Sequence, residues 1–238
     1  FKDGYPSSPK WSSDSRYLLF STDKREVYRC NVGGSLTRIL ASNEGNIYDV
    51  QISPDNNWVA YTTSGENNMD CICLYNMAEK QGRPVTMKWF DAKSPRWSED
   101  GKYLFFLSNR KYNISYSAVE WNTNFSTSNY LFVLPLTKDT SLPNELRANE
   151  FKPVADAADT KKADNKKKGK EMRDENSIKV DFDGIEERAT LLLEEEGGYR
   201  LNGMFNGKLY YSHNGKNKAL DLKTMESKNV DMNSIVCY

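Results

Sequence analysis

Residues 95–107 read PRWSEDGKYLFFL, and this stretch decides the fold because the chain contains three copies of its pattern. The other two copies align with it without gaps and read PKWSSDSRYLLFS (9–21) and VQISPDNNWVAYT (50–62). The copies are 41 and 45 residues apart, measured between their aspartates, Asp14, Asp55 and Asp100. A period in the forties, with several short strands in each unit, is typical of β-propeller blades.

Each copy predicts a strand, a tight turn and a second strand. The first strand carries a large apolar residue, which is Trp11, Ile52 or Trp97. The Asp of the following Ser-x-Asp can accept hydrogen bonds from downstream backbone amides and so form a turn. The second strand is a nearly continuous apolar run, as in Trp58–Tyr61 and Tyr103–Phe106. A continuous run predicts apolar neighbours on both faces, which a blade lying between two other blades would have.

The first repeat continues into two further strands. Val27–Val32 is the third, Gly33-Gly34 is a hairpin turn signal, and Leu36–Leu40 alternates as an exposed outer edge should. A degenerate fourth copy at 206–212 keeps the turn and the apolar strand but lacks the Trp-Ser-x-Asp half. We therefore predict an all-β fold of four-stranded antiparallel propeller blades, about four to five in this chain. The alternative is three unrelated hairpins in a sandwich or barrel.

The period breaks after the third copy. Tyr130–Leu136 still indicates a late blade strand, but apolar periodicity vanishes from 138 to 177, where Lys161–Glu171 is the most charged part. Such a segment cannot build a packed core, so we predict that 138–177 is a solvated insertion loop within a propeller segment covering 1–238. The alternative is a basic contact site for an acidic partner or nucleic acid, which nearby carboxylates and the lack of aromatics disfavour. Three later stretches are also expected to be strands: Ile178–Phe182, Ala219–Leu222 and Ser234–Tyr238.

Composition excludes several classes of protein. The 238 residues include 33 Lys+Arg and 33 Asp+Glu, and this zero balance argues against a dedicated nucleic-acid binder. The longest apolar runs are far shorter than the roughly 20 residues that span a bilayer, so no membrane span is expected. The N-terminus shows no signal-peptide pattern, and the missing initial Met suggests a fragment or a processed form. We expect a soluble protein and leave open whether it is cytoplasmic or periplasmic.

The candidate site residues all have simpler structural explanations. The single histidine, His213, precedes Asn214-Gly215 and is expected to flank a turn rather than to catalyse. Cys71 and Cys73 would share one face of a strand as small buried residues. The repeat aspartates are explained by their turns, and Glu194–Glu196 lacks the spacing of a calcium loop. The glycine pairs, Gly33-Gly34 and Gly197-Gly198, form no phosphate-binding loop. We predict no catalytic, cofactor-binding or metal-binding residue in this chain, and the substrate-binding residues are not defined.

The repeat resembles the TolB-like or WD40-like propeller repeat. A second stretch is more specific: Val180–Arg188, followed by Gly198-Tyr199-Arg200-Leu201, resembles the second propeller of tricorn-type serine proteases. A Lys/Glu-rich insertion just before it also fits that family, and the matches together cover most of residues 8–222. The resemblance implies a large serine peptidase that trims peptides, whose propellers filter or guide peptides toward catalytic modules downstream. No part of this chain matches those modules.

Three functional hypotheses follow from the resemblance. The first is a non-catalytic propeller of a tricorn-like peptidase that guides peptides and scaffolds the enzyme; its partners would be peptides and other domains, and any oligomer would form through the parent protein. The second is a stand-alone TolB-like propeller that acts in protein–protein interaction. The third is the propeller cap of a prolyl-oligopeptidase-like hydrolase.

Overall fold

The fold is seen in a computed structural model that describes residues 4–43, 45–65, 67–111, 113–116, 123–126, 129–143 and 177–231. These residues form four four-stranded antiparallel sheets, which are the blades, and one hairpin of β11 (Asn113–Tyr116) and β12 (Thr123–Ser126). No helix in the described ranges has the length and apolar character needed to cross a membrane.

The four blades follow one another along the chain, and in each blade the strands run in chain order from the inner to the outer edge. Blade 1 consists of β1 (Pro6–Trp11), β2 (Tyr17–Thr22), β3 (Glu26–Asn31) and β4 (Leu36–Ala41). Blade 2 consists of β5 (Ile47–Ile52), β6 (Trp58–Ser64), β7 (Asp70–Asn76) and β8 (Gln81–Pro84). Blade 3 consists of β9 (Ala92–Trp97), β10 (Tyr103–Ser108), β13 (Tyr130–Pro135) and β14 (Thr190–Leu191). Blade 4 consists of β15 (Tyr199–Phe205), β16 (Lys208–His213), β17 (Lys216–Asp221) and β18 (Ser227–Asn229).

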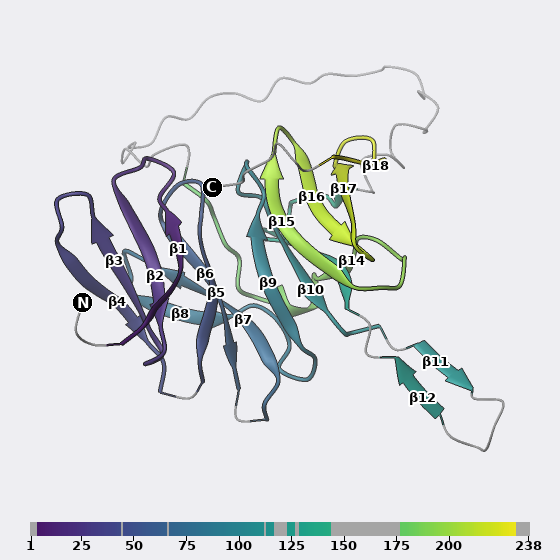
Figure 1. The fold of residues 1–238 in the computed structure, drawn as a ribbon, viewed down its shortest axis with the longest axis horizontal. Coiled ribbons are helices and arrows are strands. Elements are labelled where there is room, and N and C mark those ends of the chain that lie inside the picture. Colours follow the sequence, from purple (N-terminus) through teal and green to yellow (C-terminus); the bar gives the residue numbers. More distant parts are fainter. Residues whose placement is uncertain are drawn as a thin grey trace, which may run out of the picture.

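The blades lie side by side around a common axis, from blade 1 at the left of Figure 1 to blade 4 at the right. The inner strands of consecutive blades are in contact: β1 with β5, β5 with β9, and β9 with β15. This arrangement confirms the predicted all-β architecture of four-stranded propeller blades. The predicted strand at Ala219–Leu222 corresponds to β17, whereas the one at Ser234–Tyr238 lies outside the described residues.

Three hydrophobic clusters fill the spaces between consecutive blades. Leu19 and Val59 lie between blades 1 and 2, Ile72 and Phe106 lie between blades 2 and 3, and further residues fill the space between blades 3 and 4. That last cluster includes Phe105, Leu131, Leu209 and Tyr211. Because Phe105 and Phe106 are adjacent and both fully buried, they face opposite neighbouring blades. The continuous apolar runs of the sequence therefore reflect burial on both faces of a blade.

The Ser-x-Asp turns have the same geometry in all three full copies. In each, the serine hydroxyl donates to the aspartate two residues later: Ser12 to Asp14 at 2.7 Å, Ser53 to Asp55 at 2.6 Å, Ser98 to Asp100 at 2.7 Å. The same hydroxyls accept the amide N–H groups that open the second strand, from Tyr17, Trp58 and Tyr103. The turn also needs one residue of positive φ: Ser15 at 56°, Asn56 at 60°, Gly101 at 67°. The repeat motif is thus a turn-forming device.

The large apolar residue at the end of each inner strand has the same register but not the same burial. Trp11 pairs with Leu18 as Trp97 pairs with Leu104. Trp97 is buried against blade 2, whereas Trp11 is 52% exposed. The same position in the repeat therefore does not give Trp11 the burial that Trp97 has. The reason is that this position packs against the preceding blade, and no described residue forms a blade on that side of blade 1.

Blade 3 carries the insertions. Its third and fourth strands are separated by 136–189, of which 144–176 lie outside the described residues, so the predicted solvated loop at 138–177 stays a prediction. The predicted strand at Ile178–Phe182 is wrong, because this segment has no regular secondary structure and joins none of the described sheets. Its alternation has another cause: Ile178, Val180 and Phe182 pack on the cluster between blades 2 and 3.

Candidate functional site

A pocket of about 370 Å³ lies where the inner strands of all four blades end, and we call it the axial pocket. It is lined by the last residues of β1, β5 and β9, by Asn202–Met204 of β15, and by residues of the turns after β1, β5 and β9. Because each blade contributes the same register positions, the repeat itself builds this site. The principal side chains in its wall are Lys10, Trp11, Gln51, Arg96, Trp97, Glu99 and Met204.

The axial pocket contains two basic side chains at equivalent positions. Lys10 and Arg96 each precede the tryptophan that ends an inner strand, and Gln51 holds the same position in blade 2. The Arg96 guanidinium donates to the carbonyl oxygens of Pro95 at 2.7 Å and Leu201 at 3.2 Å. Leu201 belongs to blade 4, so this side chain is oriented by the neighbouring blade.

The only acidic side chain in the described wall of the axial pocket is Glu99. Its two carboxylate oxygens accept the backbone N–H groups of Asn206 and Gly207, each at 2.8 Å. Those two residues form the turn between β15 and β16, so Glu99 joins blade 3 to blade 4. A similar link joins blades 1 and 2, where Ser13 donates to the Pro54 carbonyl at 2.8 Å. The turns at this end thus hold consecutive blades together.

We expect Glu99→Ala to lower the free energy of unfolding by about 1 kcal/mol, because an exposed site loses two charge-assisted hydrogen bonds. Urea denaturation of the chain measures the change. Glu79→Ala, at an exposed glutamate in the turn after β7, serves as the matched control and should change stability little. Equal stabilities of the two variants would contradict the role assigned to Glu99.

The inner strands also share a backbone irregularity. Each has a register shift against its partner strand, and in the first three blades a non-glycine residue of positive φ occurs within it. These residues are Ser8 at 51°, Asp49 at 52° and Ser94 at 58°. The Asp49 carboxylate accepts hydrogen bonds from both the amide and the hydroxyl of Ser94, each at 3.2 Å. A bulge bends its strand and leaves one residue outside the ladder, so these bulges shape the strand edges around the axis.

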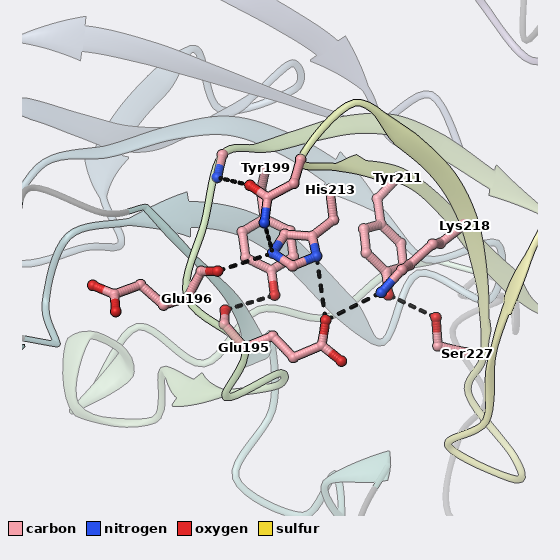
Figure 2. A network of polar contacts seen from close by, with 9 residues as sticks. Glu195, Glu196, Tyr199, Tyr211, His213, Lys218 and Ser227 are labelled. Atoms are coloured by element: carbon pink, nitrogen blue, oxygen red, sulfur yellow. Dashed lines mark hydrogen bonds and ion pairs between the residues drawn. The ribbon is translucent and has the colours of Figure 1, made fainter.

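His213 ends β16 and is 7% exposed, with the turn Asn214-Gly215 after it, as the sequence predicted. Figure 2 shows its ring stacked on Tyr199, with centroids 4.4 Å apart. Its Nδ1 lies 3.2 Å from a Glu195 carboxylate oxygen that also pairs with Lys218 at 3.1 Å, and its Nε2 lies 3.1 Å from the Glu196 carbonyl oxygen.

The residues around His213 hold its ring in place. The Tyr199 phenol donates to the Glu195 carbonyl at 2.8 Å; burial, and then the Glu195 charge, raise its pKa, so it keeps that proton. Gly197 lies so close that an added Cβ would be 2.5 Å from His213 Nε2. Among the described residues, the contacts of the ring nitrogens are the Glu195 carboxylate, the Glu196 carbonyl and the Asn214 side-chain amide. The sequence did not reveal that Glu195 holds His213.

The other candidates lie apart from one another. Cys71 and Cys73 are free thiols in β7, share one face and are buried. Their mutual hydrogen bond lowers the pKa of Cys71 and, with burial, raises that of Cys73. The repeat aspartates are in three different blades and bonded within their turns. Gly33-Gly34 forms the turn between β3 and β4, and Gly197-Gly198 precedes β15.

Four consecutive four-stranded blades around an axial pocket define the class of protein, which is the β-propeller fold. The match to family models is more specific. The chain belongs to the family of tricorn protease second β-propeller domains, whose model matches residues 1–234. This confirms the resemblance seen in the sequence.

Individual relatives agree with the family. The tricorn protease of Thermoplasma volcanium is 28% identical over 153 residues, covering 61% of this chain and 15% of that protein. A putative tricorn-like protease C-terminal subunit of Sulfurisphaera tokodaii is 27% identical over 208 residues, covering 84% of this chain and 21% of that protein. The chain thus spans about a fifth or less of the length of these relatives.

Two solved structures show the same fold. The crystal structure of the tricorn protease superposes with a TM-score of 0.67 at 20% identity, covering 96% of this chain and 23% of that one. TolB from Acinetobacter baumannii superposes with a TM-score of 0.57 at 15% identity, covering 95% of this chain and 43% of that one.

Proposed function

We propose that this chain is a non-catalytic propeller module of a tricorn-like serine peptidase, and that it guides or filters peptide substrates while scaffolding the enzyme. The observation that carries the proposal is the axial pocket, because every blade presents backbone edges and side chains to it. Peptides bind readily to such edges and pockets. Its partners would be peptides and other domains of the same peptidase. Membership in the tricorn family supports this hypothesis over the two alternatives.

Peptide binding to the chain tests the proposal. Fluorescence anisotropy with labelled peptides of mixed sequence should detect binding, and Trp11→Ala should weaken it about 3–10-fold, since Trp11 is an exposed aromatic side chain in the pocket wall. Trp89→Ala is the matched control, because Trp89 is 79% exposed in the loop between β8 and β9. If no peptide binds, or if both variants weaken binding equally, the proposal is wrong, and interaction with folded proteins becomes the better hypothesis.

A further inference from the structure

We propose that the axial pocket recognises the free C-terminal carboxylate of a peptide whose last residue has a large apolar side chain. This inference rests on the proposed function and narrows it to one chemical class of peptide. Two features of the pocket carry it: a pair of basic side chains and the apolar groups that line the same wall.

The charge of the pocket favours an anion. Its described wall contains the basic side chains of Lys10 and Arg96 and the single carboxylate of Glu99. Both oxygens of Glu99 accept backbone N–H groups of the adjacent blade, so this carboxylate is turned toward the wall of blade 4. The charged side chains of the described wall therefore sum to plus one. The two backbone N–H groups that donate to Glu99 also offset part of its negative charge.

Arg96 has the chemistry and the orientation for a carboxylate. A guanidinium carries five N–H donors in a planar arrangement that matches the two oxygens of a carboxylate. The carbonyl oxygens of Pro95 and Leu201 each accept one bond from it, which fixes the side chain across the gap between blades 3 and 4. A side chain that is already oriented loses less conformational entropy when a ligand binds.

Apolar side chains line the same pocket as the two basic groups. Trp11, Trp97 and Met204 are all in its wall. Consecutive residues of a strand point to opposite faces, so Trp97 is turned toward blade 2 while Arg96 reaches blade 4, where Met204 lies. A C-terminal residue carries its carboxylate and its side chain on the same Cα, so it can contact both kinds of group at once. The pocket volume of about 370 Å³ is within the usual range of about 300–1,000 Å³ for small-ligand sites.

The affinities of three peptides that end in phenylalanine, measured with the full 238-residue chain, test the proposal. One has a free C-terminus, one has a C-terminal amide, and one has the amide together with an internal glutamate. We expect the free acid to bind at least tenfold more tightly than the plain amide, with an advantage that shrinks as salt is added. The internal glutamate should restore little of the lost affinity.

Charge-removing variants identify the groups responsible. Lys10→Gln and Arg96→Gln should each reduce the preference for the acid over the amide several-fold, without weakening binding of the amide. Lys228→Gln is the control, since Lys228 is 78% exposed on the outer strand of blade 4 and should leave the preference unchanged. Because Arg96 also links two blades, circular dichroism checks that each variant is folded, and Lys10→Gln keeps the test decisive if Arg96→Gln is not.

The outcomes separate this inference from the proposed function. Equal binding of acid and amide would overturn the carboxylate inference and leave peptide guidance standing. Recovery of full affinity by the internal glutamate would also overturn it, because the pocket would then recognise acidic side chains. Absence of binding by all three peptides would overturn both proposals.

Discussion

Replacing Phe106 with alanine is expected to lower the free energy of unfolding by about 3–5 kcal/mol, the range typical of large-to-small changes in a packed core. Phe106 is fully buried in the cluster between blades 2 and 3. It stacks on Phe132 of the neighbouring strand, with ring centroids 5.6 Å apart. Since fully buried neighbours surround the site, it cannot collapse easily, and a cavity should remain. Chemical denaturation followed by tryptophan fluorescence measures the loss.

Phe205→Ala is the matched control for this experiment. Phe205 is the same residue type, also in a strand, but it is 55% exposed at the end of β15. Its truncation should cost well under 1 kcal/mol. Similar losses for the two variants would contradict the packing of consecutive blades, because Phe106 is buried by that packing and Phe205 is not.

The parts of the fold that the sequence predicts well are those that each repeat encodes locally. The hydrogen bonds of a Ser-x-Asp turn are local. The Ser98 hydroxyl bonds to Asp100 and to the Tyr103 amide, which are two and five residues away. The apolar run Tyr103–Phe106 likewise predicts, without reference to any other segment, that this strand is buried on both faces. Three copies of such a unit therefore predict the same structure three times, and the period then predicts how the units stack.

The sequence predicts less well whatever depends on neighbouring blades. Trp11 and Trp97 have the same motif position, yet only one has a described blade to pack against. Ile178–Phe182 alternates because one side of it is buried, and an alternating pattern alone does not specify pairing with another strand. The sequence does not predict the axial pocket for a related reason. Lys10 and Arg96 are two repeats apart in the chain and line one pocket only after the blades pack. The signal that could have found them is their shared position before the tryptophan.

Replacing Gly101 with alanine tests how the 178–189 segment packs on the blades. Gly101→Ala should destabilise the chain by about 2–4 kcal/mol, from two separate causes. Gly101 has a φ of 67°, which costs an L-residue about 1–2 kcal/mol. An alanine Cβ would also collide with Cδ1 of Ile178, and relieving such overpacking costs about 1–2 kcal/mol more. The backbone of Ile178 cannot move away freely, because its amide donates to Asp55 at 2.8 Å and its carbonyl accepts the Trp58 indole N–H at 3.1 Å, so the side chain must change its rotamer to make room.

Gly207→Ala separates these two causes. Gly207 has a φ of 69°, close to that of Gly101, but no atom lies within 4 Å of the position that its Cβ would occupy. This variant should therefore show only the conformational cost, and the difference between the two unfolding free energies isolates the collision with Ile178. Adding Ile178→Ala to the Gly101→Ala variant should then recover part of that difference, since the smaller side chain leaves room for the new methyl group. If Gly101→Ala and Gly207→Ala lose the same stability, Ile178 does not pack against the turn between β9 and β10, and this contact does not contribute to the stability of blade 3.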